Sequence, residues 1–105
     1  MGKADIGILV AFRLKPHLRP RERTGLFRRL YGYVDQSQFG RYRYEREGVM
    51  SAIPHVRLIR GAMILREQDA PAVEEFLRPV ADIHRRRVFL TPEDQEQLAP
   101  KKPRM

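Results

Sequence analysis

Alternating arginine and tyrosine side chains form the run Arg41-Tyr42-Arg43-Tyr44. On a strand, Tyr42 and Tyr44 share one face, and Arg46 continues that face. The other face carries Arg41 and Arg43. A tyrosine face turned to solvent can stack nucleic-acid bases, whereas one turned toward a helical layer packs in the core and leaves the arginines exposed. Because either arrangement exposes an aromatic or a cationic face, the run favours contact with a nucleic acid.

Positive charge is concentrated in the first two-thirds of the chain. The 105 residues carry a net charge of +8, with 21 basic and 13 acidic residues. Segment 13–66 holds 13 basic and four acidic residues, whereas 67–98 holds four arginines and eight acids. Arginine outnumbers lysine 17 to 4, and its planar fork binds phosphate oxygens in pairs. The alternative to a phosphate-binding surface is a solvated face on which arginines and acids pair. Segment 13–66, however, has too few acids to neutralise its own positive charge.

We therefore expect nucleic-acid contacts from three parts of the chain: a first helix with its approach, the arginine–tyrosine strand, and a basic C-terminal tail. RNA is favoured over DNA, and a ribosomal or other ribonucleoprotein complex suits the size and charge. The candidate residues are Arg19, Arg21, Arg23, Arg28, Arg29, Arg41, Tyr42, Arg43, Tyr44, Arg46, Lys101, Lys102 and Arg104.

Strands are predicted from residues that alternate along the chain. Residues 6–14 have one wholly apolar face and one mostly apolar face, which predicts a strand in the middle of a sheet. A polar loop is expected over 33–40. The alternation slips near Gly61, which predicts a bulge or a tight hairpin bend there. Further strands are predicted over 41–47, 56–65 and 85–90.

Helical spacing predicts a helix over 20–31 that ends at Gly32. A second helix begins at Asp69, which is placed to cap it, and is kinked or shortened at Pro79. The order β-α-β-β-α-β predicts an α+β fold, a ferredoxin-like two-layer sandwich with an antiparallel sheet and two helices on one face. A short C-terminal helix follows over 91–98. We expect one domain over 1–98 and a basic, disordered tail over 99–105.

The run Phe39-Gly-Arg-Tyr-Arg-Tyr44 loosely resembles a signature of the RNA-recognition-motif family. In that signature arginine or lysine, glycine and alternating aromatics lie on a sheet of this topology. The resemblance covers about six residues and implies RNA contact through the sheet face. That family carries the signature on its third strand, whereas here it falls on the second predicted strand.

A second resemblance covers segment 30–39, Leu-Tyr-Gly-Tyr-Val-Asp-Gln-Ser-Gln-Phe, which follows an arginine-rich helix. It is similar to the run that enters the second strand in the Cas2 family of CRISPR adaptation proteins. The resemblance implies a ferredoxin-like dimer that belongs to a nucleic-acid-processing system. That family ends its first strand in an acidic metal-binding residue, but the matching positions here hold Arg13, Leu14 and Lys15. The resemblance therefore points to a non-catalytic relative.

Residue types and spacings that the sequence lacks exclude several kinds of functional site. The chain has no cysteine, which excludes disulfides, thiol nucleophiles and cysteine-bound metals. Its three histidines, at positions 17, 55 and 84, lack the spacing of metal ligands, and its glycines form no phosphate-binding loop. We therefore expect a binding protein rather than an enzyme, with no catalytic residues, no metal and no cofactor.

The expected location of the protein follows from the length of its apolar runs and the pattern at its start, and its expected assembly follows from the open sheet. The longest nearly apolar run, 6–12, is far shorter than the roughly 20 residues that span a membrane. No secretory signal pattern is present at the start of the sequence. We expect a cytoplasmic protein with no membrane contact. A homodimer or larger homo-oligomer, formed through an open sheet edge or an exposed sheet face, is the alternative to nucleic-acid binding.

Overall fold

The computed structural model describes residues 5–37 and 40–100. These residues fold into two compact units. The first, here the sheet unit, comprises the described residues 5–16 and 54–100, and the second, the hairpin unit, comprises the described residues 17–37 and 40–53. In the described part of the chain, no helix is long and apolar enough to cross a membrane.

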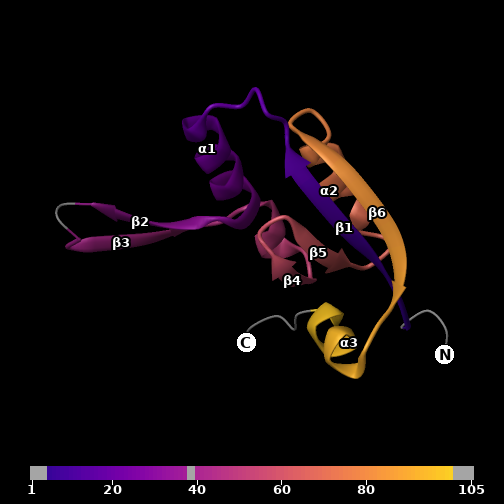
Figure 1. Ribbon diagram of the computed structural model, residues 1–105. Helices are drawn as coiled ribbons and strands as arrows, with labels where there is room; N and C mark the ends of the chain where they lie inside the picture. The colour runs from indigo at the N-terminus through magenta and orange to yellow at the C-terminus, as the bar shows by residue number, and fades with distance from the viewer. Residues whose placement is uncertain (1–4, 38–39, 101–105) are drawn as a thin grey trace. The chain divides into compact units, whose positions relative to one another are not determined.

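A four-stranded antiparallel sheet organises the sheet unit (Figure 1). Its strands lie in the order β4-β5-β1-β6, so β1 pairs with β5 on one side and with β6 on the other. This confirms the prediction that β1 is a central strand. The elements in chain order are β1 (Ile6–Leu14), β4 (His55–Ile59), β5 (Ala62–Leu65), α2 (Ala70–Leu77), β6 (Ala81–Phe89) and α3 (Pro92–Leu98).

A helix covers part of each face of this sheet. On one face, α2 packs against β1 and β6, and Val73 and Leu77 of the helix are fully buried. On the other face, α3 contacts β4, and Leu98 forms a cluster with Val56 and Ile64. Val10 is fully buried on one face of β1, and Leu9 packs against the cluster around Leu98 on the other, which explains why the strand lacks the polar face of a surface strand.

Two of the predicted strands have different bounds. The predicted strand 56–65 is two strands, β4 and β5, so the hairpin-bend reading of Gly61 is correct. A Cβ on Gly61 would lie 2.7 Å from the Phe12 carbonyl oxygen, which makes glycine necessary at this bend. The last strand begins at Ala81 rather than residue 85, because Leu14 pairs with Ala81 and the whole length of β1 serves as its partner.

The ends of the helices in the sheet unit follow local hydrogen bonds. Asp69 occupies the N-cap position of α2, as predicted, but its carboxylate accepts a hydrogen bond from Arg66 Nε at 2.7 Å and none from the helix. α2 ends at Leu77, two residues before Pro79. α3 begins as predicted: Thr91 Oγ1 accepts from the Asp94 N–H at 3.0 Å, and Asp94 Oδ2 accepts from the Thr91 N–H at 3.1 Å.

The hairpin unit contains one helix, one two-stranded sheet and one 3₁₀ turn. The prediction of a loop over 33–40 is wrong, because residues 33–37 form a strand. The predicted strand 41–47 exists as residues 42–46, but it pairs with that new strand in a separate sheet. The elements are α1 (Pro20–Tyr31), β2 (Tyr33–Ser37), β3 (Tyr42–Arg46) and η2 (Val49–Ala52).

Helix α1 has the predicted bounds. Glu22 Oε1 accepts a hydrogen bond from the Arg19 N–H at 2.8 Å at the start of the helix. At its end, the Gly32 N–H donates to the Arg28 carbonyl at 2.7 Å, and Gly32 has a φ of +84°, which favours glycine. The helix contacts η2, and Leu26, Leu30 and Met50 are buried.

The core of the sheet unit gives a test of this packing. Leu65 is fully buried, whereas Leu58 is 50% exposed on the neighbouring strand. We expect Leu65→Ala to lower the free energy of unfolding by about 2–5 kcal/mol and Leu58→Ala to lower it by less than about 1 kcal/mol. Urea unfolding followed by circular dichroism measures both. Equal losses in the two variants would contradict the assignment of the core.

Candidate nucleic-acid interface

The pairing of β2 with β3 decides which side chains share a face. Tyr33 lies directly opposite Arg46, and Asp35 lies directly opposite Tyr44. The backbone of Ser37 pairs with that of Tyr42. Because opposite residues in an antiparallel pair project to the same side, one face of the hairpin carries Tyr33, Asp35, Tyr42, Tyr44 and Arg46. We call it the tyrosine face. The reverse face carries Val34, Gln36, Arg43 and Glu45.

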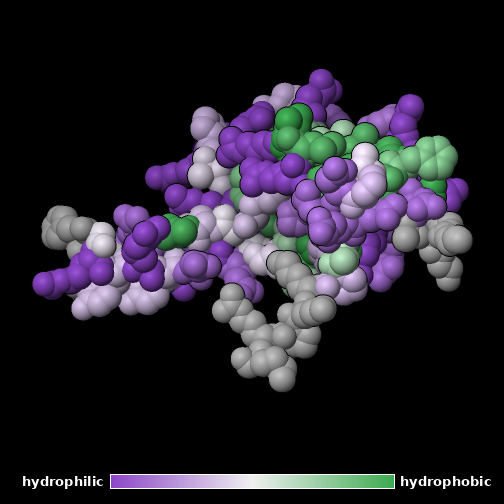
Figure 2. Space-filling view, turned by 90° about the horizontal axis from the view of Figure 1, so that it is seen from below, coloured by the Kyte–Doolittle hydropathy of each residue, from purple (hydrophilic) through white to green (hydrophobic). Residues whose placement is uncertain are grey.

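All three tyrosines on the tyrosine face are exposed. The exposed fractions are 38% for Tyr33, 46% for Tyr42 and 48% for Tyr44. Every residue of β3 is exposed, so both sides of the strand meet solvent. Figure 2 shows a mostly hydrophilic surface over the hairpin, at the left of the view. Of the two arrangements that the sequence allowed, the structure therefore has the one in which Tyr42 and Tyr44 lie outside the core.

Guanidinium groups lie over two of these tyrosine rings. Arg28 Cζ is 4.6 Å from the centre of the Tyr33 ring, and Arg46 Cζ is 5.5 Å from the centre of the Tyr44 ring. Both distances are within the range of cation–π attraction. Arg46 also pairs with Asp35, with 3.1 Å between Nη2 and Oδ2. Cations and aromatic rings thus alternate along the tyrosine face.

Two glycines hold the base of the hairpin against the end of α1. A Cβ on Gly32 would collide with the Arg46 carbonyl oxygen, and a Cβ on Gly48 would collide with the backbone of Gly32 and Leu30. The Gly48 N–H also donates to Ser51 Oγ at 2.9 Å. Because the backbones touch without side chains between them, the end of β3 lies directly against the last turn of α1.

The predicted arginines around α1 differ in their surroundings. Arg21 and Arg28 are exposed and lie two turns apart on the side of the helix opposite the buried Leu26 and Leu30. Arg19 and Arg29 are also exposed. Arg23 is half-buried, and its Nε donates to the Leu18 carbonyl at 3.1 Å.

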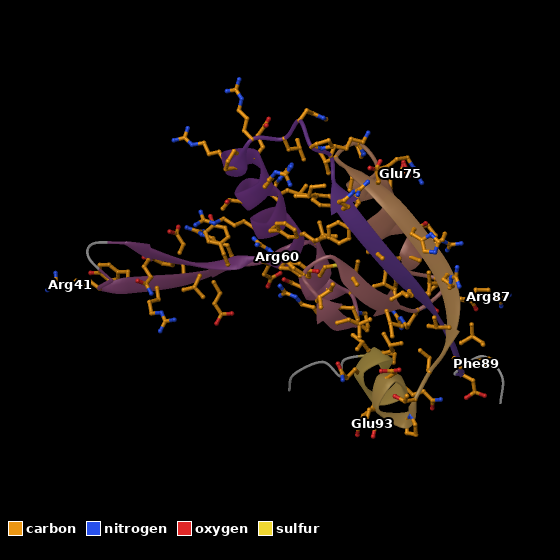
Figure 3. The ribbon with its side chains drawn as sticks, in the orientation of Figure 1. Arg41, Arg60, Glu75, Arg87, Phe89 and Glu93 are labelled. Atoms are coloured by element: carbon orange, nitrogen blue, oxygen red, sulfur yellow. The ribbon has the colours of Figure 1, made fainter. Side chains whose placement is uncertain are left out.

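The remaining predicted residues lie on the hairpin or beyond the described chain. Arg43 is exposed on the reverse face, opposite Gln36. Arg41 is exposed, and Figure 3 shows it at the tip of the hairpin, pointing away from both strands. The tail residues of the prediction lie outside the described residues: Lys101, Lys102 and Arg104.

Tyr33 and Asp35 belong to the tyrosine face, although the sequence prediction placed them in a loop. Neither residue was among the predicted contact residues. The available signal was Gly40 just before the alternating run 41–46, since a glycine has the φ of +82° that this hairpin connection requires.

Charge differs between the two units. The described part of the hairpin unit has eight arginines and four acids, whereas the described part of the sheet unit has nine basic and nine acidic residues. Acids of segment 67–98 pair with arginines of their own unit, as in Glu74–Arg85 at 2.6 Å and Asp69–Arg66 at 2.7 Å. Excess positive charge in the described chain therefore belongs to the hairpin unit.

The side chains of the hairpin unit offer stacking surfaces and phosphate-binding groups. Across the described residues, no three histidine or acidic side chains gather as metal ligands. No protein-family model, curated protein or solved structure matches the chain.

The glycine contact can be tested by adding a methyl group. We expect Gly48→Ala to destabilise the protein by at least about 1 kcal/mol, because the new Cβ meets backbone atoms that cannot move aside. Gly25→Ala is the control, since its Cβ meets nothing within 4 Å inside α1. That variant should gain about 0.5–1 kcal/mol. Thermal unfolding measures both, and a neutral Gly48→Ala would contradict the close contact.

Proposed function

We propose that the protein binds nucleic acid, single-stranded RNA in preference to DNA, through the tyrosine face and the arginines around α1. The observation that carries this proposal is the exposure of Tyr33, Tyr42 and Tyr44 on one face of a two-stranded hairpin. Tyrosine rings of a small domain are usually packed into its core, whereas these three lie outside it. Three exposed rings in a row provide a surface on which successive bases can stack.

The neighbouring charges support the same proposal. Phosphates require cations beside the stacking surface, and Arg28 lies over the ring of Tyr33. Among the described residues, Arg21, Arg41 and Arg43 are exposed and form no ion pair. Their guanidinium groups are available to bind phosphates, and that of Arg43 does so from the reverse face of the hairpin.

Single-stranded RNA fits this surface better than duplex. Bases can stack on tyrosine only when they are unpaired, and tyrosine hydroxyls can donate to or accept from the ribose 2′-OH that DNA lacks. A ribosome or another ribonucleoprotein particle in the cytoplasm would supply such strands. The expected role is therefore that of an RNA-binding component rather than an enzyme.

We also propose that the sheet unit is a ferredoxin-like domain whose first crossover contains the hairpin unit. Counted in chain order, its four strands lie in the order second, third, first, fourth, and all neighbours are antiparallel. This order is that of the split β-α-β arrangement. In this description α1 is the first crossover helix, and the β2–β3 hairpin is an insertion between α1 and β4.

Self-association is the second candidate, and the open edge of β6 favours it. Among the described strands, β6 pairs with β1 alone, and Phe89 at its end is 84% exposed and points outward in Figure 3. The run Arg85-Arg86-Arg87 lies on the same strand. Because like charges brought opposite each other destabilise a strand pair, this run disfavours symmetric pairing of two copies through β6.

Light scattering separates the two candidates. A mass near 12.4 kDa that increases on adding a single-stranded RNA oligonucleotide agrees with nucleic-acid binding. A stable dimer that does not respond to RNA would favour self-association and contradict the first proposal.

Replacement of Tyr44 tests the stacking surface. We expect Tyr44→Ala to weaken RNA binding about 5- to 150-fold, because one stacked base contributes about 1–3 kcal/mol. Tyr44→Phe keeps the ring and should stay within about threefold of the wild type. Fluorescence anisotropy with a labelled single-stranded RNA measures all three affinities. Equal affinities for Tyr44→Ala and the wild type would contradict a role of this ring in binding.

A further inference from the structure

An ion pair crosses the tyrosine face and holds one of its arginines in place. Asp35 Oδ2 accepts from Arg46 Nη2 at 3.1 Å and lies 3.4 Å from Arg46 Nε. The same guanidinium lies over the ring of Tyr44, which is directly opposite Asp35. The three side chains therefore form a closed group in which the carboxylate fixes the guanidinium over the ring.

Asp35 differs in position from the other acids of the hairpin unit. Glu22 accepts a hydrogen bond at the start of α1, Glu45 lies on the reverse face, and Glu47 follows β3. Within the described part of the hairpin unit, Asp35 is the acid that forms an ion pair. It is also the acid on the tyrosine face. Its negative charge therefore acts directly on the surface where a strand would stack.

We propose that Asp35 makes the tyrosine face selective for single strands, because it holds Arg46 over Tyr44 and away from phosphates. This inference rests on the proposed nucleic-acid function. A duplex has its bases paired and offers this face mainly phosphates, so it depends on free guanidinium groups. A single strand also offers unpaired bases, which stack on rings and on guanidinium planes. Partial neutralisation of Arg46 therefore weakens duplex binding more than single-strand binding.

The ion pair between Asp35 and Arg46 can be removed by mutation with little effect on folding. The side chains of Arg46 and Asp35 are 52% and 41% exposed, and ion pairs this exposed add little to stability. Asp35→Asn should therefore fold normally. Glu45→Gln provides a matched control, because it removes one negative charge from the same hairpin on the reverse face. Glu45 forms no ion pair among the described residues.

The experiment measures the affinity of a labelled single-stranded RNA and of a DNA duplex for the intact protein as salt is varied. In Asp35→Asn, Arg46 becomes free to bind one more phosphate. The log–log salt slope for duplex should then steepen by about 0.9, and duplex affinity should rise about eightfold at 0.1 M salt. The affinity for single-stranded RNA should rise less, because Arg46 then no longer lies over the Tyr44 ring, where it could stack with a base. The preference for single strands therefore falls several-fold.

The control variants complete the test. Glu45→Gln should change both affinities by one common factor, and Asp35→Glu should restore the preference by re-forming the ion pair. An unchanged preference in Asp35→Asn, or the same fall in Glu45→Gln, would overturn the role of Asp35. If the wild type binds neither nucleic acid, the proposed function itself fails. The two failures are therefore distinguishable.

Discussion

The close approach of backbones at Gly32 and Gly48 is the constraint on which the rest of the hairpin unit depends. These glycines let the end of β3 lie directly against the last turn of α1. The hairpin therefore begins at a fixed point beside the helix, and Arg28 of that turn lies over Tyr33 of the first strand. A side chain at either glycine would push the end of β3 away from the last turn of α1.

The two units use arginine differently. In the sheet unit, arginines are balanced by acids, and pairs such as Arg85–Glu74 and Arg87–Glu67 tie β6 to neighbouring segments. In the hairpin unit, arginines outnumber acids by two to one, and two of them lie over tyrosine rings. The described sheet unit is thus balanced in charge, whereas the described hairpin unit keeps an excess of positive charge.

Sequence patterns predicted the elements that bury apolar side chains. The bounds of β1 and α1 matched, because alternation in one and helical spacing in the other follow directly from burial. The hairpin was only half predicted. Its strand β2 reads Tyr-Val-Asp-Gln-Ser and buries no continuous face, so no hydrophobic pattern marks it. The exposure of Tyr42 and Tyr44 could not be decided either, since it depends on β3 pairing outside the main sheet.

The central claim is that RNA stacks on the tyrosine face of the hairpin unit. The most direct measurement records backbone amide NMR signals of the intact protein while a single-stranded RNA oligonucleotide is added. Residues 28–46 should shift in a saturable way, with the largest changes at Tyr33, Tyr42 and Tyr44, and the signals of the buried strand β1 should stay in place. Shifts confined to the sheet unit, or no shifts at all, would contradict the account.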